Sequence, residues 1–173
     1  MTGDEHGPDM FGGQLRQWRR VHPDLDTSGM AVIGRINRCA VLFQQAEDAS
    51  LVDAGVSRAE FVTLAAMRRT DRPLTPSQIA RETASSGAAV TKRLRRLEER
   101  GLISRRADGR DRRSSWLSLT EEGRALIDRL LPTQTEYERA LLSGLGDGRQ
   151  QQLADLLAEL LVHLEGRLGG YPS

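Results

Sequence analysis

The chain has 173 residues, of which 38% are hydrophobic, a composition that fits one folded domain and excludes a disordered chain. No apolar run reaches the roughly 18–20 residues that span a membrane, and the acidic, polar start does not resemble a signal peptide. One cysteine excludes a disulfide framework, and three scattered histidines lack metal-ligand spacing. We therefore expect a cytoplasmic protein that is not an enzyme and needs no metal or cofactor.

The net charge of +1 is unevenly distributed along the chain. Residues 85–113 contain ten lysines and arginines against four acids, a local charge of +6, so that the remaining residues carry −5. A basic segment in an otherwise acidic protein is typical of a surface that binds a polyanion. A charge run alone more often marks a solvated face. The elements around the segment must therefore decide between a solvated face and a surface that binds a polyanion.

Helix signals dominate the first part of the chain. A short basic helix ends before Pro23, and a long helix capped by Thr27 or Ser28 carries apolar residues at helical spacing. Two capping boxes, in which a Ser or Thr and a Glu or Gln three residues later bond reciprocally with the backbone, open the next two helices. The predicted helices and boxes are 15–20, 29–52, Ser57 with Glu60, and Thr75 with Gln78.

The basic segment itself is predicted to be a helix followed by a hairpin. Ser85 or Ser86 caps the helix, which runs to Arg100 and is followed by Gly101 in the left-handed conformation. Two β-compatible stretches, 102–105 and 115–119, then flank a polar turn. The order helix, helix, turn, helix and hairpin is that of a winged helix-turn-helix, so we predict a mainly α fold with a small β-wing.

Two long helices follow the predicted wing. Thr120 caps the first, in which Pro132 is expected to produce a kink, and Asp147 caps the last. The last helix carries leucines at spacings of three and four residues. So wide an apolar stripe on a terminal helix favours a second copy of the chain as its partner, with packing inside the chain as the alternative.

One face of the basic helix is suited to a DNA groove. Val90, Leu94 and Leu97 form an apolar stripe for the core, which leaves small and cationic side chains on the opposite face. Ser85 and Ser86 lie at the helix N-terminus, whose free amides favour a phosphate. Arginine pairs with guanine, and lysine and arginine reach phosphates. The candidates for major-groove contact are Ala88, Ala89, Thr91, Lys92, Arg95 and Arg96.

The predicted turn of the wing carries further cations. Arg110 and Arg112 are candidates for an adjacent minor groove, where A·T-rich stretches concentrate negative potential. Asp111 lies between cations and is expected to brace Arg113 rather than to contact DNA.

Taken in order, these motifs resemble those of the MarR (multiple-antibiotic-resistance regulator) family. Three parts of the family's winged motif are matched in this chain. They are the first helix of the motif, the helix that enters the groove together with the first wing strand, and the wing together with the start of the next helix. The matching stretches are 74–80, then 90–94 with 97–103, and then 108–113 with 117–123.

The resemblance implies a homodimeric transcriptional regulator, most often a repressor released by a small ligand, that binds a pseudo-palindromic operator in double-stranded DNA. In this family the N- and C-terminal helices form the dimer interface. The implied regions are an N-terminal extension, 1–27; dimerisation helices, 28–56 and 120–168; the winged DNA-binding domain, 57–119; and a tail, 169–173.

The N-terminal extension is similar to that of the urate-responsive, PecS-type subgroup of the family. The subgroup's ligand residues match Trp18, Arg93 and Arg105, but its aspartate position is Val62 here. This departure argues against urate itself and leaves a planar or aromatic anion near Trp18 as the expected effector. In the alternative interpretation Trp18 packs the extension onto the body and Arg93 makes a local ion pair.

Two other functions remain open at this point. Cys39, alone on an apolar helical face, is interpreted first as a core residue, but Arg35 and Arg38 nearby leave redox sensing as an alternative. A winged helix can also serve as a dimerisation module that does not bind DNA. Salt-sensitive binding to duplex DNA separates that module from a regulator.

Overall fold

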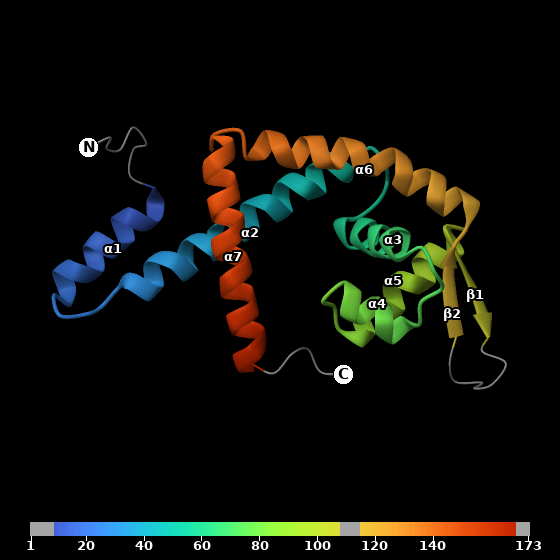
Figure 1. The fold of residues 1–173 in the computed structure, drawn as a ribbon, viewed down its shortest axis with the longest axis horizontal. Coiled ribbons are helices and arrows are strands. Elements are labelled where there is room, and N and C mark those ends of the chain that lie inside the picture. Colours follow the sequence, from blue (N-terminus) through green and yellow to red (C-terminus); the bar gives the residue numbers. More distant parts are fainter. Residues whose placement is uncertain (1–8, 108–114, 169–173) are drawn as a thin grey trace. The chain divides into compact units, whose positions relative to one another are not determined.

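The computed structural model describes residues 9–107 and 115–168 (Figure 1). Across these residues, seven helices and one two-stranded antiparallel sheet form two compact units, which divide between Ala49 and Ser50. The predicted fold class, mainly α with a small β-hairpin, is confirmed. No helix in the described part of the chain has both the length and the apolar character needed to cross a lipid bilayer.

The first unit contains α1 (Met10–Val21) and most of α2 (Ser28–Leu51). The predicted helix 15–20 was too short, because α1 begins five residues earlier. The side chain of Asp9 caps it by accepting a hydrogen bond from the amide of Gly12 at 2.7 Å. This cap compensates for the low helix propensity of the Gly-Gly pair in the first turn.

Two contacts attach α1 to α2 within this unit. The guanidinium of Arg35 donates to both carboxylate oxygens of Asp9, at 2.8 and 3.1 Å. The ring of Phe11 occupies the position that a Cβ on Gly34 would need, so only glycine permits this close approach. The same aspartate therefore caps one helix and binds the next.

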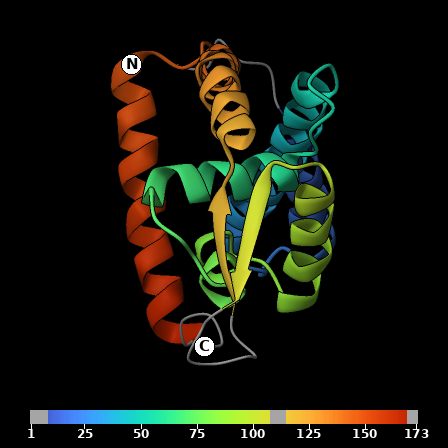
Figure 2. The ribbon, with the colours of Figure 1, turned by 90° about the vertical axis from the view of Figure 1, so that its right-hand side faces the viewer.

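The second unit begins with the predicted winged helix-turn-helix. Both capping boxes are present, at Ser57 with Glu60 and at Thr75 with Gln78. Figure 2 shows the hairpin beside these helices. The elements are α3 (Arg58–Thr70), α4 (Pro76–Glu82), α5 (Gly87–Glu99), β1 (Ile103–Ala107) and β2 (Ser115–Leu119).

The core of the second unit contains the apolar stripe predicted on α5. Its three residues are completely buried, together with side chains from α3, α4, β2 and the next helix, α6 (Glu121–Leu141). Burial of each large aliphatic side chain contributes about 1.5–3 kcal/mol. The completely buried aliphatic residues are Leu64, Leu74, Ile79, Val90, Leu94, Leu97, Leu117 and Ile127.

The hairpin is longer on its first strand than predicted, since β1 starts at Ile103 and continues to Ala107. The register pairs Ile103 with Leu119 and Ala107 with Ser115. An isolated bridge joins Leu74, just before α4, to Leu117 of β2 through two backbone hydrogen bonds of 3.0 and 2.9 Å. The helix-turn-helix is thereby attached to the wing through the backbone.

The last two helices are α6 and α7 (Asp147–Leu168). Thr120 caps α6 as predicted and also donates to the carbonyl of Gly101 at 2.7 Å. The helix continues through Pro132. The prediction for the start of α7 was wrong by one residue, because Asp147 is the first helical residue and not the cap.

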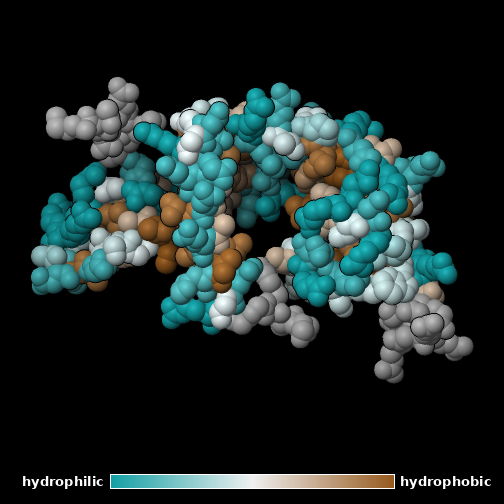
Figure 3. Space-filling view, in the orientation of Figure 1, coloured by the Kyte–Doolittle hydropathy of each residue, from teal (hydrophilic) through white to brown (hydrophobic). Residues whose placement is uncertain are grey.

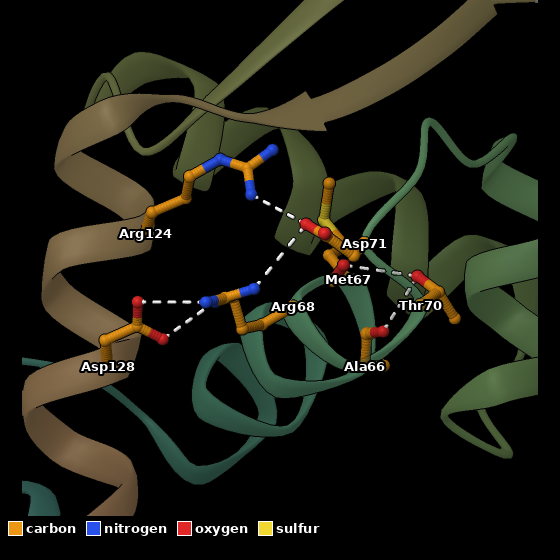
Figure 4. Close-up of polar contacts among 7 residues, drawn as sticks. All are labelled: Ala66, Met67, Arg68, Thr70, Asp71, Arg124 and Asp128. Atoms are coloured by element: carbon orange, nitrogen blue, oxygen red, sulfur yellow. Dashed lines mark hydrogen bonds and ion pairs between the residues drawn. The ribbon is translucent and has the colours of Figure 1, made fainter.

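A chain of alternating charges joins α3 to α6 (Figure 4). Arg68 binds both carboxylate oxygens of Asp128, at 2.7 and 3.3 Å, and lies 3.5 Å from Asp71. Asp71, which ends α3 in the left-handed conformation, also accepts from Arg124 at 2.8 Å. The hydrogen bond from Arg124 and the charges of both arginines hold the pKa of Asp71 below its ordinary value.

Large apolar side chains remain exposed on α1, α2 and α7. No residue of α7 is buried, and Figure 3 shows hydrophobic surface along this helix. The other elements of the second unit therefore leave the leucine stripe of α7 uncovered. The exposed residues of α2 and α7 are Met30, Val32, Ile33, Val41, Leu42, Phe43, Leu153, Leu156, Leu157, Leu161, Val162 and Leu164.

Candidate nucleic-acid interface

The candidate interface is built on α5, whose start is fixed by a serine. Of the two predicted caps, Ser86 accepts from the amide of Ala89, at 3.4 Å, whereas Ser85 donates to the carbonyl of Thr83 at 3.0 Å. The turn before α5 contains Ala84 with a positive φ of 48°. Ser86 is exposed beside the free amides of the helix, and Ser85 is half-buried.

The predicted DNA-facing residues form one exposed surface on α5. Thr91 donates back to the carbonyl of Gly87 at 2.9 Å, and Arg95 pairs with Glu99 at 2.8 Å while its side chain stays 81% exposed. The apolar stripe anchors the opposite side of the helix. The surface can therefore present small and cationic groups to a polyanion without uncovering the core. Its residues are Ala88, Ala89, Thr91, Lys92, Arg95 and Arg96, all exposed.

Beside this surface, a buried carboxylate lies near two arginines of α5 and a third, Arg100, which is the C-cap residue of that helix. Glu60 is 2% exposed, with Arg96 Nε 3.7 Å from its Oε1 and Arg100 Nη1 3.6 Å from its Oε2. Arg93 is half-buried and donates to Thr63 Oγ1 at 3.0 Å. We call Glu60, Arg93, Arg96 and Arg100 the Glu60 cluster.

Electrostatics keep Glu60 ionised despite its burial. Burial by itself raises the pKa of Glu60, but the hydrogen bonds from Ser57 and the charges of Arg96 and Arg100 outweigh it, so that the pKa of this carboxyl lies below its ordinary value. Burial lowers the pKa of Arg93, and the charge of Glu60 opposes that effect. The sequence identified Glu60 only as part of a capping box, since spacing along the chain does not reveal pairs between α3 and α5.

The base of the wing is attached to α5 by Arg105. Its guanidinium donates to Glu98 of α5 at 3.1 Å and to the hydroxyl of Ser115 on β2 at 2.7 Å. Arg105 was predicted to bind an effector, and it is here a link between three elements. The other predicted wing residues, Arg110, Asp111, Arg112 and Arg113, lie outside the described residues.

The candidate effector residues have separate surroundings. Trp18 on α1 is 43% exposed and stacks on His22, with ring centroids 5.9 Å apart and planes inclined by 28°. It lines a shallow pocket with residues 21–25 of the same unit. Arg93 and Arg105 belong to the second unit and bind different partners there. Val62 packs against the core, which leaves no carboxylate at that position.

Cys39 is exposed on α2, so the interpretation of this residue as part of the core was wrong. Within residues 9–107 and 115–168, no group of three or more His, Cys, Asp or Glu side chains is placed to hold a metal ion.

Comparison with known proteins identifies the family. The MarR family model matches residues 54–114. The transcriptional regulator PecS of Dickeya dadantii is 38% identical over 152 residues, which cover 87% of this chain and 92% of PecS. The chain belongs to the MarR family. The predicted family is thus confirmed, and with it the predicted class of protein, a transcriptional regulator.

Solved structures of similar regulators agree with the fold of this MarR-family chain. A MepR–DNA complex from S. aureus has a TM-score of 0.68 at 27% identity, covering 75% of this chain and 95% of MepR. BpsR of Bordetella bronchiseptica, whose DNA binding is regulated by 6-hydroxynicotinic acid, has a TM-score of 0.64 at 26% identity. That match covers 78% of this chain and 98% of BpsR.

Proposed function

We propose that this MarR-family protein is a homodimeric repressor that binds a pseudo-palindromic operator in double-stranded DNA. The observation that carries the proposal is the exposed cationic face of α5, which is anchored to the core by three completely buried side chains. The DNA complex of MepR, a relative of similar fold, supports it. Such a protein acts where the chromosome lies, which fits the cytoplasmic location expected from the sequence.

In this proposal each predicted residue keeps its role at the DNA. Lysine and arginine of the α5 surface reach bases and backbone, with Ala88, Ala89 and Thr91 against the groove floor. Ser85 and Ser86 lie towards a phosphate at the helix N-terminus. Arg110 and Arg112 enter the minor groove, and Asp111 braces Arg113.

The uncovered leucines of α7 support the dimer, together with the exposed apolar residues of α1 and α2. A two-fold dimer places its two α5 helices in half-sites about one helical turn apart. The implied regions then act as the sequence suggested, with 28–56 and 120–168 in dimerisation and 57–119 in DNA binding.

A planar or aromatic anion is the proposed effector that releases the operator. Regulation of BpsR by 6-hydroxynicotinic acid, a ligand of this kind, supports the proposal. The half-exposed indole of Trp18 offers a stacking face, and Arg93 and Arg105 offer charge. Thermal shift with a panel of purines and aromatic acids, repeated on Trp18→Ala, tests this part, and undiminished binding by the variant would contradict it.

Selection of bound duplexes from a random pool tests the main proposal. We expect one pseudo-palindromic sequence to be enriched. Its affinity should fall by orders of magnitude between about 50 and 200 mM salt, because several phosphates are contacted. Lys92→Ala and Arg95→Ala should each weaken binding, while an exposed change far from α5, such as Glu138→Gln, should not. Absence of salt-sensitive duplex binding would instead indicate a dimerisation module.

A further inference from the structure

The Glu60 cluster contains a charge that the local fold does not require. A capping box accepts either Glu or Gln at its third helical position, and the second box of this chain uses the neutral Gln78 at the equivalent place. Glu60 accepts from the Ser57 amide and hydroxyl, both at 2.9 Å, through its Oε2 alone. A glutamine would satisfy the same backbone amide.

The other oxygen of Glu60 is not used by the cap. Among the described residues, Glu60 Oε1 is the one buried side-chain oxygen or nitrogen without a hydrogen-bond partner. Its nearest cation is Arg96, whose Nε lies 3.7 Å away, too far for a hydrogen bond but close enough for strong attraction. Because a buried carboxylate is stabilised chiefly by nearby cations, the charge on this oxygen attracts Arg96 without contributing to the cap.

The arginines around Glu60 come from the candidate DNA-binding helix α5 and from its C-cap position, Arg100. Residues 93, 96 and 100 follow the spacing that places side chains on one face of a helix. Arg96 belongs both to the exposed surface of α5 and to the Glu60 cluster. Its side chain is 62% exposed, and its Nε lies 3.7 Å from Glu60 Oε1. A phosphate would therefore compete with Glu60 for Arg96.

We propose that Glu60 is a positioning and specificity-determining residue, whose carboxylate restrains Arg96 and Arg100 from the α3 side. The restraint weakens their contacts with phosphates, which form on DNA of any sequence. It thereby favours base contacts at the operator over non-specific binding. The proposal rests on the DNA-binding function proposed above. Non-specific binding depends almost entirely on charge, whereas operator binding also needs side chains in fixed positions. A buried negative charge beneath the helix weakens non-specific binding and supports binding to the operator.

Glu60→Gln tests this with the cap preserved. We expect its affinity for a random duplex to rise about three- to tenfold, while its affinity for the selected operator stays equal or falls. The ratio of the two affinities should thus decrease by at least the same factor. Fluorescence anisotropy at several salt concentrations measures both, on protein whose active fraction has been titrated and whose fold has been checked by circular dichroism.

Two matched controls separate this role from others. Glu82→Gln removes a carboxylate of α4 whose partner, Arg69, is not among the candidate DNA-binding residues, and it should change both affinities by similar factors, leaving the ratio unchanged. Glu60→Asp keeps the charge and shortens the reach to the cap, so it should lower stability with a smaller change in the ratio. A ratio in Glu60→Gln that matches wild type, or a fall that Glu60→Asp reproduces in full, overturns the proposal.

A second variant decides the matter if Glu60→Gln does not fold. Arg96→Gln alters an exposed side chain, and we expect it to weaken operator binding more than random-duplex binding. Equal losses overturn the proposal. If the wild-type protein itself shows no preferred duplex sequence, the proposed function fails; if it shows one and the variants leave the ratio unchanged, only the role of Glu60 fails.

Discussion

Gly123 shows how a single backbone position supports the wing. It lies in the first turn of α6, and a Cβ there would collide with the carbonyl oxygen of Leu102. That carbonyl also accepts a hydrogen bond from the amide of Thr120 at 3.1 Å, so neither side can move freely. The close approach holds the start of α6 against the end of the α5–β1 connection.

Gly123→Ala should therefore destabilise the protein by about 1–3 kcal/mol, because the backbone must shift to make room. Urea denaturation followed by circular dichroism measures the change. Gly148→Ala is the matched control, since that glycine also lies in the first turn of a helix and has no atom within 4 Å of the added Cβ. A Gly123→Ala protein as stable as Gly148→Ala would contradict the close contact.

The depressed pKa of Glu60 makes a second prediction at this scale. Its folded pKa lies below its unfolded value, so its ionisation stabilises the fold above the unfolded value of about 4.5. This contribution is lost as pH falls through the lower, folded pKa. The free energy of unfolding of wild type should thus fall more steeply between pH 7 and pH 3 than that of Glu60→Gln. Parallel curves from chemical denaturation would disprove it.

The sequence predicted the local contacts of these residues but not their contacts between helices. Both capping boxes could be identified because their partners are three residues apart, and the stripe of α5 followed from helical periodicity. The pairing of Glu60 with Arg96 and Arg100 could not be predicted, because it joins residues 36 and 40 positions apart. Nothing in local spacing specifies such a contact.

At the scale of elements, α3, α4, α5 and α6 were each predicted together with a capping residue, whereas α7 was predicted from its leucine spacing and its predicted cap was wrong. The first helix was underestimated, since its cap, Asp9, precedes a Gly-Gly pair that lowers helix propensity. The charge chain from Asp128 through Arg68 and Asp71 to Arg124 joins α3 to α6 over distances of up to 60 residues in sequence. These ion pairs form only once the fold brings α3 and α6 together, so the sequence could not predict them.

Docking of α1 on α2 depends on Gly34, and Gly34→Val should release it. The added side chain would displace the ring of Phe11 from its contact with the backbone at Gly34. We expect trypsin to cleave after Arg19 or Arg20 about tenfold faster or more, because local opening becomes easier. Gly29→Val is the control, since its added Cβ meets no atom within 4 Å. Equal cleavage rates would show that Phe11 does not hold α1.

At the scale of the whole molecule, α2 and α7 each expose several large apolar side chains, and apolar surface of this kind typically marks a protein–protein interface. The sequence could predict this surface from the leucine spacing. The geometry of the partner, by contrast, depends on a second chain.

Leu157→Glu should break the proposed dimer, because it places a charge on the exposed apolar face of α7. Light scattering after gel filtration should give twice 19.2 kDa for wild type and 19.2 kDa for the variant. Operator affinity should fall by at least about tenfold, since one half-site is lost. Glu165→Gln on the same helix should stay dimeric. A monomeric wild type would contradict the proposal.

The bridge between Leu74 and Leu117 has a consequence for local unfolding. Because the strand of the wing bonds to the segment before α4, the wing cannot open without breaking backbone bonds of the helix-turn-helix. The two parts should therefore open as one cooperative unit and exchange their amide hydrogens at a common rate. A disturbance at the base of the wing would then also destabilise the helix-turn-helix, which contains the helix proposed to face the DNA.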